Sequence, residues 1–469
     1  MLNNFKQNIK TTTQKLKVLS DLPQIQLKYQ KTLQNTQISQ KLTLLTDNKY
    51  RPSPFLSHSF LQSLFNVRYS RNLIINYKRE YIKLSDGGQI SLDWANPINN
   101  QNHQEYEPSP DTKILFIIHG LTGGSNMNYI KSIVQEGQKQ AFRCVAFNSR
   151  GVNTELSTPY PFNGICLKDL DYSMNLVHQR YPKADIFAVG ASYGANMLIR
   201  WAGNVKGSNF LKGIVGLSTP FCIKQCIQSM GYIYEGFFVQ LMKNNCINPH
   251  KEILEKLKNS HGICLNKLQK TRTIKEFHSE FTVKLYGFNS VDEYFNLSDI
   301  TNTHTQNIQV PTLLMHSKDD PIVTYKCVPQ EQLLENKNII QVETSHGAHV
   351  CWYYGKQPKR VYNYIYIYLY IFFHLFQKSG ILNLQFNILM LLYSNNNNNN
   401  KNYFNKIKII SNNDYFYLYN KNQIEQRFII FIIRIYIKCK QLIFIFVYIL
   451  IIIQFLCNHK TQFFNIQIQ

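Results

Sequence analysis

Short apolar runs alternate with helix-length segments between about residues 51 and 355, and this alternation constrains the fold more than any other feature of the sequence. Several runs are continuously apolar, as strands are when a parallel sheet buries both of its faces. Strand and helix in alternation predict an α/β fold with a mostly parallel, eight-stranded sheet flanked by helices. The expected strands are Tyr81–Leu84, Ile90–Trp94, Ile114–Ile118, Arg143–Phe147, Ile186–Val189, Gly213–Leu217, Thr312–His316 and Ile339–Glu343.

One interval interrupts the alternation. About 90 residues, 220–309, separate two consecutive expected strands. Such a length is uncommon for a loop in a compact domain and predicts an inserted helical cap. Its first half, Ile227–Met242, is rich in aromatic, aliphatic and Met side chains. These suit a lid over an apolar ligand, because flexible Met side chains accept ligands of several lengths. They suit the cap's own core equally well, and the sequence leaves both interpretations open.

The N-terminal 50 residues differ from the central region. They form a basic, Gln- and Lys-rich extension, which we expect to be disordered or loosely helical. They contain no unbroken apolar run, so no signal peptide is predicted. The ten Cys of the chain are scattered without a CxxC pair. This pattern indicates reduced thiols and an intracellular protein, either cytoplasmic or membrane-associated.

Residues 361–469 form a low-complexity tail of Asn, Ile, Tyr and Phe, with no Ala, Pro or Trp and only one Gly. These residue types are those of A+T-rich codons, which favours translated intron or downstream sequence. The functional alternative is a membrane anchor at Leu442–Cys457, whose 16 residues fall short of the ~20 that a spanning helix needs. The globular α/β region is therefore expected to span residues 51–360.

The charge is concentrated in the two ends of the chain. The formal net charge is +23, of which +6 lies in residues 1–50 and +11 in residues 356–469. A strongly basic protein would suggest nucleic acid or an anionic membrane surface as its partner. No nucleic-acid-binding motif accompanies the charge, so we expect no nucleic-acid partner.

The strongest local signal is Gly190-Ala191-Ser192-Tyr193-Gly194, a G-x-S-x-G pattern between an expected strand and an expected helix. A nucleophile elbow needs this context, because its Ser stands at strained φ and ψ in a very tight turn. Glycines two positions before and after the Ser let the neighbouring backbone approach. The pattern predicts Ser192 as a nucleophile.

A second glycine-rich turn, His119–Gly124, follows another apolar strand. It lacks the Lys-Ser/Thr ending of a phosphate-binding loop and the spacing of a dinucleotide fingerprint. In a hydrolase, such a turn supplies half of an oxyanion hole through its main-chain N–H groups. We therefore expect the N–H groups of Leu121 and Tyr193 to bind the oxyanion, and His119 to pack the loop.

A serine nucleophile needs a base, and the base needs a carboxylate to orient it. Downstream, an Asp pair follows one expected strand and two His follow the next. We favour Asp320 over Asp319, because it stands immediately before Pro-Ile-Val, where the loop turns back over the sheet. We favour His349 over His346, because Gly347 would give the loop freedom to bring His349 in.

Seven segments then carry a family resemblance. They are DGGQISLDWA (Asp86–Ala95), HGLTGGS (His119–Ser125), FNSRGVN (Phe147–Asn153), GASYGANML (Gly190–Leu198), KLYGFNSVDEYF (Lys284–Phe295), HSKDDP (His316–Pro321) and TSHGAHV (Thr344–Val350). With these motifs, the chain from about Tyr50 to about residue 360 resembles the α/β-hydrolases of the abhydrolase-domain type, in the AB hydrolase 4 branch of esterases and lipases. Two positions depart from that branch: Ala348 stands where Gly is usual before the base, and Cys351 stands where many members have Gly.

The resemblance implies an α/β-hydrolase fold and a Ser-His-Asp triad of Ser192, His349 and Asp320. It implies a serine carboxylesterase or lipase acting on short- to medium-chain acyl esters, such as monoacylglycerol or phospholipid-type lipids, through an acyl-enzyme. No metal or organic cofactor is implied, and a membrane surface is a candidate partner. The alternatives are an alcohol O-acyltransferase, whose His-x4-Asp signature is absent, and a non-catalytic hydrolase-fold binding protein. The oligomeric state is left open.

Overall fold

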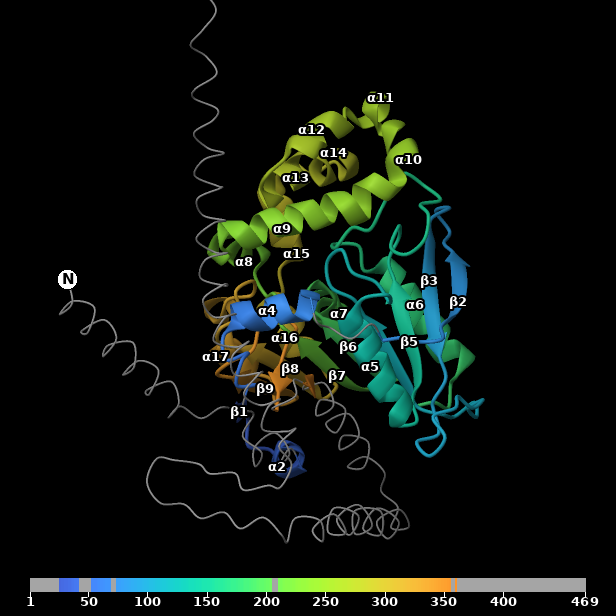
Figure 1. Cartoon of the computed structure of the whole chain (residues 1–469), viewed down its shortest axis with the longest axis vertical. Helices are drawn as coiled ribbons and strands as arrows, with labels where there is room; N and C mark the ends of the chain where they lie inside the picture. The colour runs from blue at the N-terminus through green and yellow to red at the C-terminus, as the bar shows by residue number, and fades with distance from the viewer. Residues whose placement is uncertain (1–24, 42–51, 69–72, 205–209, 356–358, 361–469) are drawn as a thin grey trace, which may run out of the picture. The chain divides into compact units, whose positions relative to one another are not determined.

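The computed structural model describes residues 25–41, 52–68, 73–204, 210–355 and 359–360 (Figure 1). The predicted tail 361–469, with its candidate anchor, lies outside these residues. Among the helices of the described ranges, none combines the length and the hydropathy needed to cross a bilayer.

The core of the described chain is a nine-stranded sheet in the order β1-β9-β8-β7-β6-β4-β5-β3-β2. The six strands from β9 to β5 pair in parallel. The pairs β2–β3, β3–β5 and β1–β9 are antiparallel. The strands are β1 Ile25–Tyr29, β2 Lys78–Lys83, β3 Gln89–Ala95, β4 Ile114–Ile118, β5 Arg143–Asn148, β6 Ile186–Ala191, β7 Leu211–Leu217, β8 Thr312–Ser317 and β9 Ile339–Thr344.

The eight predicted strands correspond to β2–β9, and the prediction of eight strands was wrong by one. The ninth strand, β1, lies in the N-terminal extension and pairs with β9. Ile25, Leu27 and Tyr29 alternate with polar residues and pack against the core, as one face of an edge strand does. The helix α2 (Leu33–Lys41) follows, and its Ile38 is fully buried. Residues 25–41 are therefore ordered parts of the domain, and not the expected disordered or loosely helical extension.

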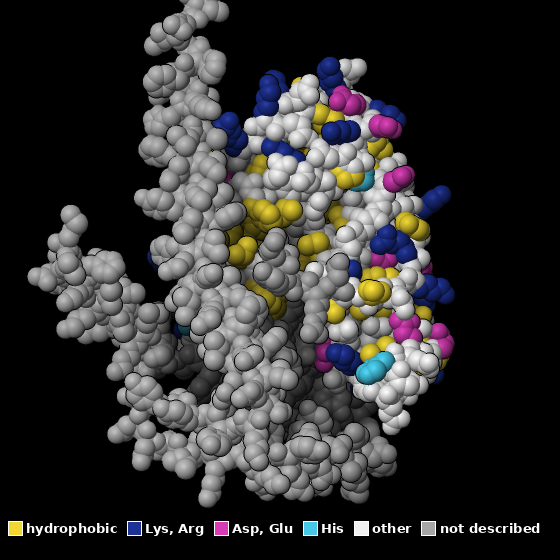
Figure 2. Space-filling view, in the orientation of Figure 1, with side chains coloured by type: hydrophobic (Ala, Val, Ile, Leu, Met, Phe, Trp, Pro, Cys, Tyr) yellow, Lys and Arg dark blue, Asp and Glu magenta, His cyan; other side chains and the backbone are white. Residues whose placement is uncertain are grey.

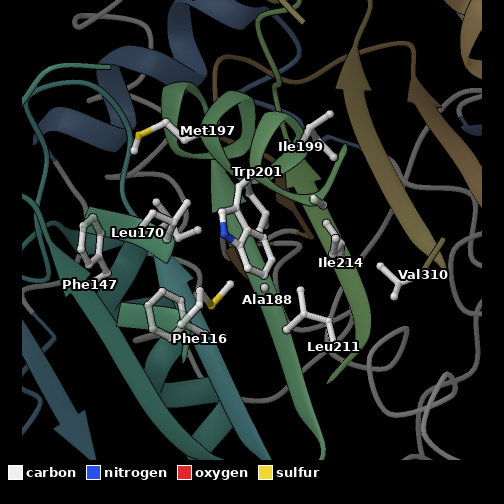
Figure 3. Close-up of a cluster of buried hydrophobic side chains, with 14 of the residues drawn as sticks. Phe116, Phe147, Leu170, Ala188, Met197, Ile199, Trp201, Leu211, Ile214 and Val310 are labelled. Carbon is white, nitrogen blue, oxygen red and sulfur yellow. The ribbon is translucent and has the colours of Figure 1, made fainter. Parts of the chain in front are cut away.

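The two faces of the sheet carry separate apolar clusters, because neighbouring side chains of a strand point to opposite faces. The helix α5 (Asn128–Lys139) packs with α2 on one face, and α6 (Lys168–Arg180) packs with α7 (Tyr193–Asn204) on the other. Figure 3 shows Trp201 of α7 lying over the strands, close to Ala188. This packing fixes α7, the helix that follows the elbow, firmly against the sheet.

A helical cap follows β7, as predicted, and Figure 1 shows it across one end of the sheet. The last helix of the predicted insertion 220–309 does not belong to the cap. This helix, α16 (Asn302–Asn307), packs against α7, because Gly203 has no Cβ where the main chain of His304 approaches. The cap helices are α8 Ile223–Ser229, α9 Tyr232–Met242, a π-helical turn Lys243–Ile247, a 3₁₀ turn Asn248–His250, α10 Lys251–Glu255, α11 Leu257–His261, α12 Leu265–Lys270, α13 Ile274–Glu280, α14 Thr282–Tyr286 and α15 Val291–Ser298.

Three short elements and one surface helix complete the described chain. A 3₁₀ turn and α17 lie between β8 and β9, and a two-stranded ribbon follows β9. The helix α4 precedes β2, and Figure 1 shows it beside the end of the cap that carries α8. The bounds are α4 Ser59–Arg68, the 3₁₀ turn Tyr325–Cys327, α17 Gln330–Leu334, β10 Tyr353–Tyr354 and β11 Lys359–Arg360.

Candidate active site

Ser192 stands between the end of β6 and the start of α7, with a left-handed φ of 53°. That conformation is strained for a residue with a side chain. Its N–H donates to the carbonyl of Leu217 at 2.7 Å, which holds the turn. A Cβ on Gly190 would lie 2.5 Å from Ala195 Cα, and one on Gly194 would lie 2.3 Å from the carbonyl oxygen of His119. Both glycines are thus required by close backbone approach, as the pattern predicts for a nucleophile elbow.

The structure brings Ser192, His349 and Asp320 together in one series of hydrogen bonds. His349 Nε2 lies 2.6 Å from Ser192 Oγ, and His349 Nδ1 lies 3.0 Å from Asp320 Oδ2. A carboxylate accepts, so Nδ1 carries the proton and Nε2 is free to accept from the serine hydroxyl. Residues from the ends of three different strands therefore meet at the C-terminal edge of the parallel sheet.

Asp320 is well held for such a role. It is 4% exposed, and its second oxygen, Oδ1, accepts from the main-chain N–H groups of Ile322 and Val323 at 2.9 Å each. These donors satisfy the carboxylate and fix its plane, so the oxygen that faces His349 cannot turn away.

The two alternative residues, Asp319 and His346, form a separate pair. His346 Nδ1 lies 3.7 Å from Asp319 Oδ2, and the Ser317 hydroxyl donates to the other oxygen of Asp319. The two neighbouring Asp residues therefore differ in their partners: Asp320 lies against His349, and Asp319 lies against His346.

The loop that carries His349 is tightly framed. Ala348 and Cys351, the two departures from the branch pattern, are both buried and pair with each other through an antiparallel bridge. Gly347 differs from the expectation, since a Cβ there would lie 2.5 Å from the indole nitrogen of Trp352. The glycine is needed for close packing of this loop, and the expected freedom of movement is not the reason for it.

The second glycine-rich segment forms a turn beside the elbow. The Gly123 N–H donates to the Gly120 carbonyl at 3.0 Å, and Thr122 takes a left-handed φ of 61° at the third position, where a type II turn requires it. The Gly120 N–H donates to the Tyr129 hydroxyl at 2.9 Å. This turn lies against Gly194, so it places Leu121 near Ser192. Tyr193 is the first residue of α7, and its N–H therefore has no partner within the helix.

His119 lies behind this turn. Its Nδ1 donates to the Gly120 carbonyl at 2.7 Å, and its Nε2 accepts from the Ser149 N–H at 3.3 Å. Complete burial lowers its pKa to about 4, so the ring is neutral near pH 7. These contacts give His119 a packing role in the loop.

Two amide side chains join the core to the cap, the buried Asn196 and the exposed Asn245, and no sequence motif identifies either. Asn196, one turn after Ser192, donates to the carbonyls of Pro220 and Ser298 at 2.9 Å each. Asn245, in the π-helical turn of the cap, donates to the carbonyl of Thr122 at 3.0 Å. The two bonds of Asn196 join the two ends of the cap. The bond of Asn245 joins the cap to the turn beside the elbow.

A cavity of about 70 Å³ lies between Ser192 and the cap. Its wall is mostly apolar, and the cap contributes Ile227, Met230 and Phe238 to it. The rest of the segment Ile227–Met242 divides between other roles, since Met242 lies in a core of the cap while Tyr232 is 73% exposed. The two interpretations of this segment thus each hold for part of it. No group of three or more metal-ligating side chains occurs in the described ranges.

A model of the α/β-hydrolase fold family matches residues 113–351, which include the turn, the elbow and both Asp–His pairs. The chain belongs to the α/β-hydrolase fold family. The family resemblance inferred from the seven motifs is thereby confirmed. The predicted fold is confirmed as well, since six parallel central strands are flanked by helices, as expected of an α/β-hydrolase.

Three curated relatives show what this α/β-hydrolase is similar to. The embryogenesis-associated protein EMB8 of Picea glauca is 28% identical over 68% of this chain and 70% of the relative. The phospholipase ABHD3 of Bos taurus is 28% identical over 66% of this chain and 75% of the relative. The monoacylglycerol lipase of Saccharomyces cerevisiae is 27% identical over 66% of this chain and 77% of the relative. Membership of this family and these relatives support a hydrolase.

Proposed function

We propose that the protein is a serine carboxylesterase or lipase that hydrolyses short- to medium-chain acyl esters, including those of monoacylglycerol or phospholipid type. The observation that carries the proposal is the hydrogen-bond series from Ser192 through His349 to Asp320. The names of two relatives, a phospholipase and a monoacylglycerol lipase, support a lipid ester as the substrate class.

The first half of the proposed reaction acylates the enzyme. His349 Nε2 takes the hydroxyl proton of Ser192 as the oxygen attacks the ester carbonyl. The main-chain N–H groups of Leu121 and Tyr193 donate to the oxyanion that forms, and the N-terminus of α7 adds a favourable dipole. Asp320 orients the imidazole and stabilises its positive charge. His349 then gives the proton to the departing alcohol.

The second half releases the acid. Water, with His349 as base, attacks the acyl-enzyme, and the proton passes back to Ser192 Oγ as the acid leaves. The apolar wall of the cavity from Ile227, Met230 and Phe238 suits the acyl chain. Contact between the acyl chain and these side chains removes apolar surface from water, which favours binding.

The test is hydrolysis of p-nitrophenyl esters from acetate to laurate by the full chain and by its Ser192→Ala variant. We expect activity in the wild type and a loss of at least about 10³-fold in the variant. Ser109→Ala, at an exposed position, is the matched control and should retain activity. Equal hydrolysis by wild type and Ser192→Ala would refute the proposal, and ethyl ester formed when ethanol is present would favour acyl transfer instead.

A further inference from the structure

The surface helix α4 exposes three apolar side chains. Phe60, Leu61 and Leu64 form its outward face and are 52%, 41% and 49% exposed. Its inward face is mixed: Gln62 is fully buried and accepts from the main-chain N–H of Tyr353 at 3.1 Å, and Phe65 packs on the Tyr353 ring, with centroids 5.1 Å apart. A surface helix in water normally carries polar side chains on its outward face.

The cap helix α9 is apolar on its outward side as well. Tyr232, Ile233 and Phe237 are 73%, 78% and 51% exposed. The one charged residue of this helix, Glu235, turns inward and accepts from the main-chain N–H of Ile274 at 3.0 Å. The outer face of α9 therefore offers apolar groups to its surroundings without a carboxylate among them.

These two faces adjoin. The side chain of Tyr234 on α9 lies near that of Ser63 on α4, and Figure 1 shows α4 lying beside α8 and α9. Figure 2 shows apolar side chains gathered over α9. We call this surface the apolar rim; it consists of Phe55, Phe60, Leu61, Leu64, Tyr232, Ile233 and Phe237. A contiguous exposed apolar patch on a folded domain marks an interaction surface.

The apolar rim continues into the cavity that contains Ser192. The exposed ring of Phe237 contacts that of Phe238, with centroids 6.4 Å apart, and Phe238 lines the cavity. Ile227 and Met230, from the same part of the cap, line it too. The same part of the cap therefore offers apolar groups to an acyl chain both at the rim and at the cavity beside the nucleophile.

We propose that the apolar rim docks the protein on a lipid surface, with α4 and the outer face of α9 inserted at the level of the head groups. Aromatic and aliphatic side chains on adjoining helices are the groups that bury in such an interface. A protein partner, or a second copy of this chain, would cover the apolar route to Ser192, whereas a lipid surface would supply substrate along it. The choice of a lipid surface and the delivery of substrate rest on the proposed function; the exposed apolar face does not.

The test of docking is flotation of the full chain with vesicles of ether-linked phosphatidylcholine. Every protein in this test also carries Ser192→Ala, so that no lipid is hydrolysed. We expect Ile233→Glu, and separately the pair Leu61→Glu and Leu64→Glu, to weaken vesicle binding at least about tenfold, because a carboxylate would have to lose its water. Ile74→Glu is the matched control. Ile74 is 87% exposed and lies outside the rim, so the same change of charge should leave binding intact.

Delivery is tested with Ser192 present. The rim variants should hydrolyse dissolved p-nitrophenyl acetate at the wild-type rate and lose hydrolysis of an acyl ester held in vesicles. If no ester is hydrolysed, the proposed function fails, while flotation still decides the docking. Vesicle binding that is absent, or unchanged by the rim variants, overturns the proposal. A dimer in solution that the rim variants dissociate also overturns it, because the face would then join two copies.

Discussion

The buried amide of Asn196 should hold the cap to the core, and its removal gives a quantitative test. Its Nδ2 donates to the carbonyl of Pro220, just after β7, and to that of Ser298, at the end of α15. One side chain thus joins the two ends of the cap, from a position one turn beyond Ser192. Asn196→Ala removes both hydrogen bonds and leaves two buried carbonyl oxygens without these donors.

The expected cost follows from these contacts. Each hydrogen bond contributes about 0.5–1.5 kcal/mol net, and a buried polar group left without a partner costs about 1–3 kcal/mol. Part of this is offset, because Asn196 Oδ1 is buried without a partner among the described residues and disappears with the amide. We therefore expect the free energy of unfolding to fall by about 2–3 kcal/mol, which lowers the Tm by roughly 3–5 °C for a domain of about 300 residues.

Urea unfolding and calorimetry of the full chain measure this loss. Asn204→Ala, at the exposed last residue of the same helix, is the matched control and should change stability by no more than about 0.5 kcal/mol. Asn196→Asp keeps the size of the side chain but sets carboxylate oxygens against both carbonyls, so it should destabilise the protein at least as much as Asn196→Ala. A loss in Asn196→Ala no larger than in Asn204→Ala would refute the reasoning.

Three further predictions concern the site and its surroundings. Asp320→Asn should lower kcat about 10³- to 10⁴-fold, whereas Asp319→Asn should stay within about threefold of wild type; ester kinetics measure both, and equal losses would contradict the pairing described above. Asn245→Ala, which frees the turn beside the elbow, should lower kcat/KM about tenfold, with the neighbouring Asn244→Ala unchanged; a loss confined to KM would count against this positioning role. Burial lowers the pKa of His316 to about 4, from an ordinary value of 6.5. Below pH 6.5 the unfolded chain therefore binds a proton on this imidazole while the folded chain keeps it neutral. The free energy of unfolding should then fall progressively as the pH decreases from 6.5 toward 4. Burial also lowers the pKa of His119 and His278, so His316→Phe should make that fall shallower by about a third in urea titrations at several pH values, and an unchanged slope would argue against it.

The strands and the elbow were predictable because their signals are local. Continuous apolar runs identify strands buried on both faces, and all eight expected runs form strands of the sheet. The elbow requires glycines at fixed spacing from Ser192, and backbone approach within a few residues explains both. The strand β1 was missed although its sequence alternates, since an isolated five-residue pattern is weak and its partner, β9, lies more than 300 residues further along the chain.

The site divides in the same way. By itself, the sequence determined the α/β class, the cap, the nucleophile candidate and a choice between two Asp and two His residues, because each depends on residue type and spacing. Only the tertiary structure decided which Asp faces which His, since Asp319 and Asp320 are adjacent in the chain yet lie against different His residues. It also decided the anchoring of the cap by Asn196 and the apolar outer face of α4, because burial and hydrogen-bond partners arise only when distant segments pack together.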